Sequence, residues 1–121
     1  MSEEITMFHN PRCSTSRAAL ETLEGSGRSY EVVQYLKTPP TAEQLRELVA
    51  MFDDHTRLVR RDVAFKRLGL TDADVETKEQ VVVVLAEHPA LLQRPILIRH
   101  DADGDRAIIG RPKEAVPEFL A

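Results

Sequence analysis

The fold is decided by the stretch Ile5-Thr6-Met7-Phe8-His9-Asn10-Pro11-Arg12-Cys13-Ser14-Thr15-Ser16-Arg17. Its first five residues predict a short strand ending near His9, because apolar residues alternate there and then give way to polar ones. Asn10-Pro11 breaks that strand, and residues 14–16 are types that cap helices. The stretch therefore predicts a strand that passes through a short loop into a helix.

The next residues complete a strand–helix–strand unit. The helix has a buried side made of Ala18, Ala19, Leu20 and Leu23, and Gly25-Ser26-Gly27 ends it. Residues 30–36 are rich in β-branched and aromatic side chains and predict a second strand. Because a helix separates the two strands, we expect them to be parallel.

A helical segment follows after Pro39-Pro40. Thr41 with Gln44 predicts a capping box and a helix, and a short helix is expected over about 56–61. Thr77 with Gln80 predicts another cap, opening a helix to about Glu87. Four consecutive valines inside this last segment favour a strand by propensity alone.

The chain closes with a hairpin and a helix. Residues 96–99 and 107–109 predict antiparallel strands joined by a loop over 101–105. Gly110-Arg111-Pro112 is expected to start the last helix, whose inward side carries Val116, Phe119 and Leu120. We expect one α/β domain over 1–121, with a mixed four-stranded sheet and a helical insertion at about 41–88 between the second and third strands.

The composition excludes several classes of protein. Of 121 residues, 42% are hydrophobic, so the chain can bury a core, and the net charge of −4 argues against general nucleic-acid or membrane binding. The longest apolar run has six residues, Val81 to Ala86, and the N-terminus does not resemble a signal peptide. We therefore expect a cytoplasmic protein, and a monomer because no exposed apolar stripe is evident. We expect no metal site, because the histidines lack ligand spacing and Cys13 is the single cysteine.

Cys13 lies where the strand passes into the helix. Free N–H groups and the helix dipole at such a position favour an anion and lower a thiol pKa. Ser16 is positioned to donate a hydroxyl to the thiolate, and Arg12 and Arg17 add positive charge. A small buried hydrophobe remains the alternative interpretation of a lone cysteine. A phosphatase-type loop is excluded, because the sixth residue after Cys13 is Ala19 and not arginine.

The sequence resembles the glutaredoxin-coupled arsenate reductase family, which has a thioredoxin-like fold. The matching segments, in family order, are the loop from His9-Asn10 through Cys13 to Thr15-Ser16-Arg17, Tyr35-Leu36 with Thr38-Pro39-Pro40, Leu58-Val59-Arg60, His88-Pro89, Leu92 with Arg94-Pro95-Ile96, and Gly110-Arg111-Pro112. The match runs over nearly the whole chain, although Ser14 replaces a glycine of some members.

The resemblance implies roles for individual residues. Cys13 is the expected nucleophile, and Arg60, Arg94 and Arg111 are expected to bind the oxyanion, since a guanidinium offers forked donors and keeps its charge. The resemblance leaves open whether Arg60 or Arg61 faces the site. The expected supporting residues are His9, Asn10, Ser16, Arg17 and Pro95. His9 is expected to raise the local positive potential, and Pro95 is expected to follow a cis peptide bond.

The implied activity is arsenate reduction. No cofactor is expected to stay bound; glutathione or another low-molecular-weight thiol would be the co-substrate and glutaredoxin the protein partner. Three alternatives remain open. They are an RNA polymerase-binding regulator of the Spx type, against which the missing second cysteine counts, a general glutathione-linked thiol oxidoreductase, and an interaction module with an inert cysteine.

Overall fold

A computed structural model describes residues 3–121, and contacts divide the chain into two compact units. The first, here the sheet unit, comprises residues up to Thr38 together with Arg94–Ala121. The second, the helical unit, comprises Pro39–Gln93 and is inserted between the second and third strands. Within the described residues, no helix is long and apolar enough to cross a membrane.

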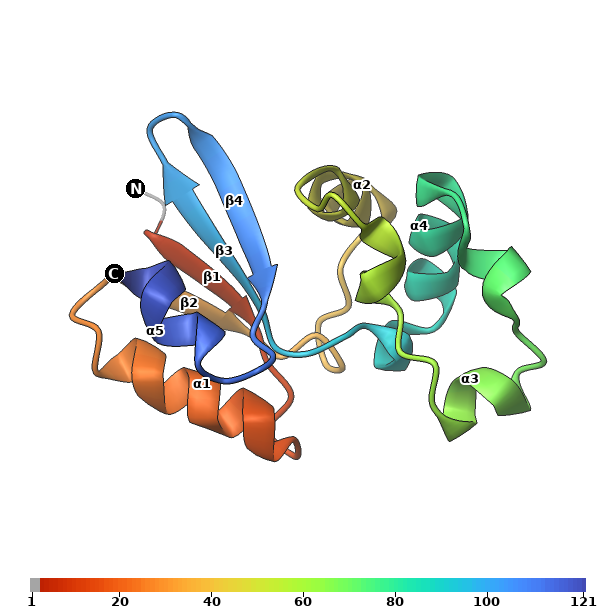
Figure 1. Ribbon diagram of the computed structural model, residues 1–121, viewed down its shortest axis with the longest axis horizontal. Coiled ribbons are helices and arrows are strands. Elements are labelled where there is room, and N and C mark those ends of the chain that lie inside the picture. The colour runs from red at the N-terminus through yellow and green to blue at the C-terminus, as the bar shows by residue number, and fades with distance from the viewer. Residues whose placement is uncertain (1–2) are drawn as a thin grey trace. The chain divides into compact units, whose positions relative to one another are not determined.

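The sheet unit has a four-stranded mixed sheet in the order β2-β1-β3-β4. Its strands are β1 (Ile5–Phe8), β2 (Tyr30–Val33), β3 (Ile96–Asp101) and β4 (Gly104–Ile109), and its helices are α1 (Ser14–Glu24) and α5 (Ala115–Leu120) (Figure 1). β1 pairs with β2 in parallel, while β1 with β3 and β3 with β4 are antiparallel. The predicted α/β fold with a mixed sheet is confirmed.

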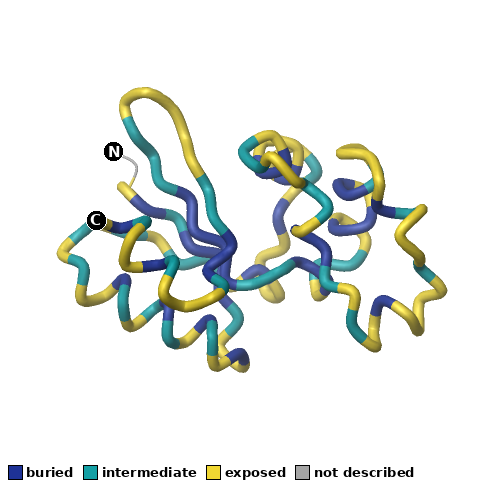
Figure 2. The backbone as a smooth tube through the Cα atoms, viewed as in Figure 1, coloured by how far each residue is buried: buried dark blue, intermediate teal, exposed yellow. Residues whose placement is uncertain are grey.

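The core of the sheet unit lies between the central strands and two helices. Buried residues of β1 and β3 pack against buried residues of α1 and α5, and Figure 2 shows these segments in dark blue. The strands contribute Ile5, Met7 and Leu97, and the helices contribute Ala19, Leu23, Val116 and Leu120. The spacing Ala19 to Leu23 is one helical turn, and Ile5 and Met7 share one face of a strand. These periodicities fix the side of the sheet that α1 covers.

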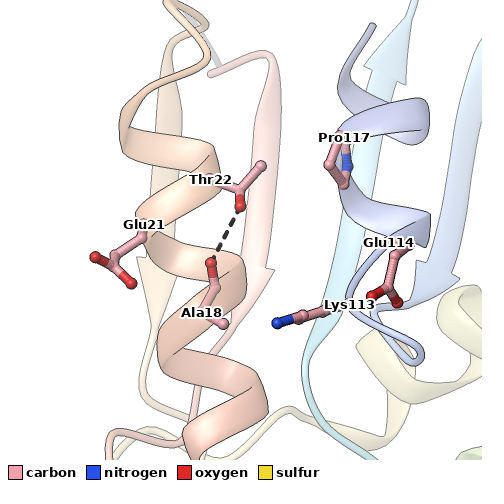
Figure 3. Close-up of a pocket in the computed structure, with 6 residues that line it drawn as sticks. All are labelled: Ala18, Glu21, Thr22, Lys113, Glu114 and Pro117. Atoms are coloured by element: carbon pink, nitrogen blue, oxygen red, sulfur yellow. Dashed lines mark hydrogen bonds between the residues drawn. The ribbon is translucent and has the colours of Figure 1, made fainter.

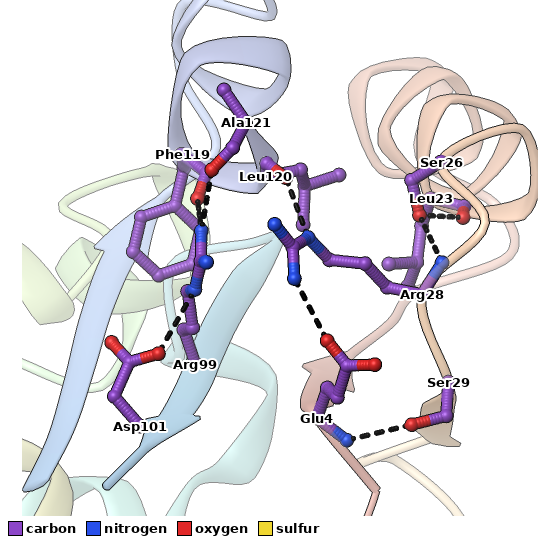
Figure 4. Close-up of polar contacts among 10 residues, drawn as sticks. All are labelled: Glu4, Leu23, Ser26, Arg28, Ser29, Arg99, Asp101, Phe119, Leu120 and Ala121. Carbon is purple, nitrogen blue, oxygen red and sulfur yellow. Dashed lines mark hydrogen bonds and ion pairs between the residues drawn. The ribbon is translucent and has the colours of Figure 1, made fainter.

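Two arginines hold the C-terminal end of α5 (Figure 4). Arg28 Nε donates to the Leu120 carbonyl oxygen at 2.6 Å, and its Nη1 lies 2.8 Å from the Glu4 carboxylate. Arg99 Nη1 donates to the carbonyl oxygens of Phe119 and Ala121, each at 2.9 Å. The last carbonyls of a helix lack intrahelical partners, and these guanidinium groups supply donors for them.

The helical unit contains α2 (Ala42–Ala50), α3 (Val63–Arg67) and α4 (Lys78–Glu87), with short 3₁₀ turns η1 (His55–Leu58), η2 (Asp72–Val75) and η3 (Pro89–Leu91). Both predicted capping boxes are present, Thr41 with Gln44 and Thr77 with Gln80. The valines of α4 are helical, and three of them, Val81, Val82 and Val84, are buried. Burial on one helix face therefore outweighs their strand propensity.

Several predicted boundaries are wrong. The second strand stops at Val33, because the N–H groups of Lys37 and Thr38 both turn back to the Gln34 carbonyl. The expected helix over 56–61 is only the 3₁₀ turn η1, which ends when Val59 pairs with Leu92 as a β-bridge.

The hairpin and last helix also differ from expectation. The strands extend to Asp101 and from Gly104, so two residues connect them in place of a five-residue loop. The last helix begins at Ala115, after a turn in which Ala115 N–H bonds to the Pro112 carbonyl. Pro112 therefore precedes the helix and does not occupy its first turn.

Candidate active site

The strand register of the sheet unit brings three chain segments to one edge of the sheet. Phe8 at the end of β1 pairs with Ile96 at the start of β3, and Ile96 pairs with Ile109 at the end of β4. The residues that follow Phe8, precede Ile96 and follow Ile109 therefore meet at this edge. These segments contain Cys13, Arg94 and Arg111.

Cys13 is the N-cap residue of α1. Its backbone is extended, at φ −96° and ψ 122°, and its side chain makes no capping hydrogen bond, so the expected capping by residues 14–16 is wrong. The Cys13 N–H bonds to the Asn10 carbonyl at 3.0 Å, which closes the loop after β1. Cys13 is a buried residue, 9% exposed to solvent.

Arg111 contacts the sulfur directly. Its Nη2 lies 3.3 Å from Cys13 Sγ, and its Nε donates to the Arg94 carbonyl oxygen at 2.7 Å. The second bond fixes the plane of the guanidinium relative to the thiol. A fixed fork of donors next to a sulfur suits recognition of a thiolate or an oxyanion.

Arg94 has unused donors. Its Nε and Nη1 atoms are buried, and neither has a hydrogen-bond partner among residues 3–121. Burying N–H groups of a cation without acceptors is costly. The Arg94–Pro95 peptide bond is cis, as the resemblance predicts, and the Arg111–Pro112 bond is cis as well.

Opposing effects set the pKa of the Cys13 thiol. Burial raises this pKa, because a thiolate is poorly solvated away from water. The backbone N–H of Ser16, the donor side chain and positive charge of Arg94, and the backbone N–H of Thr15 all lower it. The lowering effects win, so the pKa lies below its ordinary value and the thiolate is favoured.

Ser16 and His9 form a buried pair behind the sulfur. Ser16 Oγ accepts the Asn10 N–H at 3.0 Å and forms a second hydrogen bond, 2.8 Å long, with His9 Nδ1. Burial and then the charge of Arg17 lower the pKa of His9, which disfavours the charged imidazolium. The Ser16 hydroxyl is thus bonded to His9 and the Asn10 N–H in place of the expected bond to the thiolate, and the lowered pKa of His9 works against the positive potential expected of it.

The remaining loop residues hold its shape. Asn10 Oδ1 accepts the Arg12 N–H at 3.0 Å, and Arg17 Nη1 donates to the Pro11 carbonyl oxygen at 2.9 Å. The Pro95 carbonyl accepts the Gly110 N–H at 2.8 Å, which ties the Arg94 segment to the Arg111 segment. These bonds fix the loop before α1 and join the two segments that carry the arginines.

Comparison with known proteins places this geometry in a family. A sequence model described as the ArsC family matches residues 8–119, which is most of the chain. The chain belongs to the ArsC family. An arsenate reductase of Neisseria meningitidis is 40% identical over 120 residues, covering 97% of this chain and 98% of the relative. An arsenate reductase of Escherichia coli is 38% identical over 118 residues, covering 96% of this chain and 80% of the relative.

The fold of this ArsC-family chain agrees with solved structures. The structure of an arsenate reductase from Vibrio cholerae superposes with a TM-score of 0.80 at 31% sequence identity, covering 98% of both chains. This likeness confirms the thioredoxin-like fold that the sequence resemblance implies.

Arg60 and Arg61 belong to the helical unit and have partners there. Arg60 pairs with the Asp62 carboxylate and its Nη1 donates to the Ala90 carbonyl oxygen at 3.2 Å. Arg61 Nε lies 2.9 Å from the Asp72 carboxylate, and its Nη1 donates to the carbonyls of Thr56 and Val59. The sheet unit by itself thus brings together two of the three arginines expected at the site.

Sequence reasoning missed the way these side chains hold one another. Arg111 bonds to the Arg94 carbonyl, and Ser16 bonds to His9. Neither pair has a spacing in the sequence that would indicate its bond. Among the described residues, no three His, Cys, Asp or Glu side chains gather as metal ligands. The site in the sheet unit is a thiol surrounded by arginine donors.

Proposed function

We propose that this ArsC-family chain is an arsenate reductase in which Cys13 is the nucleophile. The strongest support comes from Arg94, whose buried Nε and Nη1 donors lack acceptors beside a thiol with a lowered pKa. A tetrahedral oxyanion would supply those acceptors. Arg111, already bonded to the sulfur, would hold the same oxyanion from a second direction.

The first step forms a sulfur–arsenic bond. The Cys13 thiolate attacks arsenic, one arsenate oxygen accepts protons and leaves as water, and an enzyme–S–AsO₃ adduct results. The arsenic is still As(V) at this point. Arg94 and Arg111 offset the negative charge that the adduct carries.

The second step needs another thiol, because Cys13 is the single cysteine of the chain. We propose that glutathione supplies it. Its thiolate attacks the Cys13 sulfur, a disulfide forms, and the sulfur–arsenic bond breaks with its electron pair going to arsenic, which leaves as arsenite. Each sulfur loses one electron and arsenic gains two. Glutaredoxin then reduces the mixed disulfide and restores Cys13.

Arg60 is proposed as a third oxyanion ligand on the family resemblance alone. Its bonds to Asp62 and the Ala90 carbonyl lie within the helical unit. The supporting roles of His9, Asn10, Ser16, Arg17 and Pro95 are positional in this proposal. We propose further that the protein acts as a monomer in the cytoplasm, where thiols are kept reduced.

Turnover coupled to glutathione reductase and glutaredoxin tests the proposal. Cys13→Ser should abolish arsenate-dependent NADPH consumption, and Arg94→Lys and Arg111→Lys should each lower kcat/KM for arsenate by about a hundredfold. Arg106→Lys, an exposed arginine on β4, is the matched control and should have little effect. Arg60→Lys should raise KM for arsenate while Arg61→Lys does not.

Other outcomes would point to the alternatives. Full activity of Cys13→Ser would contradict the mechanism. Reduction of a small disulfide with glutathione, without any turnover of arsenate, would favour a general thiol oxidoreductase. Capture of RNA polymerase by an inactive protein would favour the regulator.

A further inference from the structure

A groove runs along the sheet unit between α1 and the segment Arg111–Pro117; we name it the α1–α5 groove (Figure 3). One part has a volume of about 480 Å³ and is lined by Ala18, Glu21, Thr22, Lys113, Glu114 and Pro117. Thr22 and Pro117 face each other across it, and the Thr22 hydroxyl bonds to the Ala18 carbonyl oxygen. This volume lies within the range of pockets that bind small molecules.

The groove continues toward Cys13. A second part of about 440 Å³ shares Ala18, Lys113 and Glu114 with the first and adds Ser14, Thr15, Arg111 and Pro112. Arg111 is also the residue whose Nη2 lies 3.3 Å from Cys13 Sγ, and Ser14 follows the cysteine in the chain. Cys13 itself lines neither part, but one end of the groove is formed by its chain neighbour Ser14 and by Arg111, the residue that contacts the sulfur.

The groove carries unneutralised charges of both signs. Lys113 extends toward α1, and its ammonium forms no ion pair with any residue of the described chain. Glu114 and Glu21, both at the groove, likewise have no ion-pair partner within residues 3–121. A ligand that bears both a carboxylate and an ammonium would match these charges.

We propose that the α1–α5 groove binds the low-molecular-weight thiol that attacks Cys13. The inference rests on the proposed function, which requires a second thiol near the sulfur. A peptide-like zwitterionic thiol fits, with a carboxylate at Lys113 and an amino group toward the glutamates. Glutathione has this chemistry. In this position the glutathione sulfur would approach Cys13 from the end of the groove that Arg111 lines, and the charge of Arg111 would favour the attacking thiolate.

Other occupants fit the groove less well. Arsenate is much smaller than the groove and carries only negative charge, whereas two glutamates line the walls. A thiol without charges would leave Lys113 and the carboxylates without partners. A folded protein such as glutaredoxin would cover the groove's rim, and this case is distinguished by the experiment.

Binding is tested without any turnover by titrating S-methylglutathione, which has no free thiol, into ¹⁵N-labelled Cys13→Ser protein. The amide signals of Thr22 and Lys113 should shift. In the double variant that also carries Lys113→Glu, binding should be weaker by about tenfold. Lys78→Glu, the same charge change at an exposed residue of α4, is the matched control and should leave binding unchanged. Shifts that avoid the groove, or equal binding by Lys113→Glu, would overturn the inference.

Steady-state kinetics gives the second readout. In the cysteine-containing protein, Lys113→Glu should raise KM for glutathione by about tenfold, with kcat and KM for arsenate unchanged. A rise in KM for glutaredoxin instead would overturn the assignment in favour of the protein partner.

The two hypotheses fail in different ways. Normal arsenate turnover by Lys113→Glu with an unchanged KM for glutathione would contradict thiol binding in the groove, while the proposed reductase activity would stand. Binding of S-methylglutathione in the groove without arsenate turnover would support thiol binding there and exclude arsenate as the substrate.

Discussion

The reactivity of Cys13 depends on a few donors acting against burial. Burial raises the pKa of the thiol, and the N–H groups of Ser16 and Thr15 together with Arg94 lower it further than burial raises it. Ser16 contributes through its backbone, because its hydroxyl is bonded to His9 and Asn10. The His9–Ser16 pair thus holds the start of α1 in place, which keeps these N–H groups directed at the sulfur.

Removing the charge of Arg94 should make the thiol less acidic. In Arg94→Gln the thiolate loses a cationic donor, so the pKa of Cys13 should rise and the alkylation rate at neutral pH should fall. The measurement is the rate of iodoacetamide labelling between pH 5 and about 10, for wild type and variant. Arg106→Gln serves as the control, and a profile of Arg94→Gln that coincides with wild type would contradict this assignment.

The sequence predicted part of this site for a physical reason. A strand, a break and a helix-capping segment place Cys13 at a helix start, and that position favours a thiolate whatever the rest of the fold does. The partners of His9 and Ser16 were not predictable, because either side chain has several possible hydrogen-bond partners and only the folded geometry selects one. The assignment of Arg111 to the site came from the family resemblance alone, because 98 positions separate it from Cys13.

At the scale of elements, the segment that follows β4 approaches the segment that precedes β3 closely at Gly110. A Cβ atom at this position would lie 2.7 Å from Pro95 Cγ, 3.3 Å from Leu97 Cδ1 and 3.2 Å from Val116 Cγ2. These neighbours are buried, and a proline ring has little freedom to move away. Glycine therefore lets Arg94-Pro95 and Arg111 lie side by side.

Gly110→Ala should destabilise the protein by about 1–3 kcal/mol, because the new methyl group overpacks the contact with Pro95. Urea unfolding measures the change. Gly25→Ala is the matched control: its Cβ would lie 3.6 Å from the nearest atom, in ordinary contact, and its φ of −84° suits alanine. Equal stability of both variants would show that the close approach is relieved at no cost.

Elements were predictable where local chemistry decides them and wrong where long-range pairing does. The capping boxes at Thr41 and Thr77 fix the starts of α2 and α4 by bonds within four residues. The end of η1 depends instead on the bridge between Val59 and Leu92, which no local pattern contains. β2 is likewise shortened by a turn at Gln34, although its residues have high strand propensity.

At the scale of the whole molecule, the fold gathers the thiol and two arginines by strand register alone. The pairings Phe8 with Ile96 and Ile96 with Ile109 bring the three segments together within the sheet unit. The sequence resemblance and the ArsC match over residues 8–119 agree with this arrangement. In the proposed mechanism, Cys13 first reacts with arsenate and then forms a disulfide with a second thiol.

Intact-protein mass spectrometry tests whether Cys13 reacts in this order. Wild type and Cys13→Ser are incubated with arsenate and glutathione in the absence of glutaredoxin, beside samples lacking arsenate. Wild type should carry a glutathione adduct on Cys13 that forms only with arsenate and is accompanied by arsenite, whereas Cys13→Ser should carry no adduct. No adduct on wild type, or the same adduct at the same rate without arsenate, would contradict the proposed mechanism.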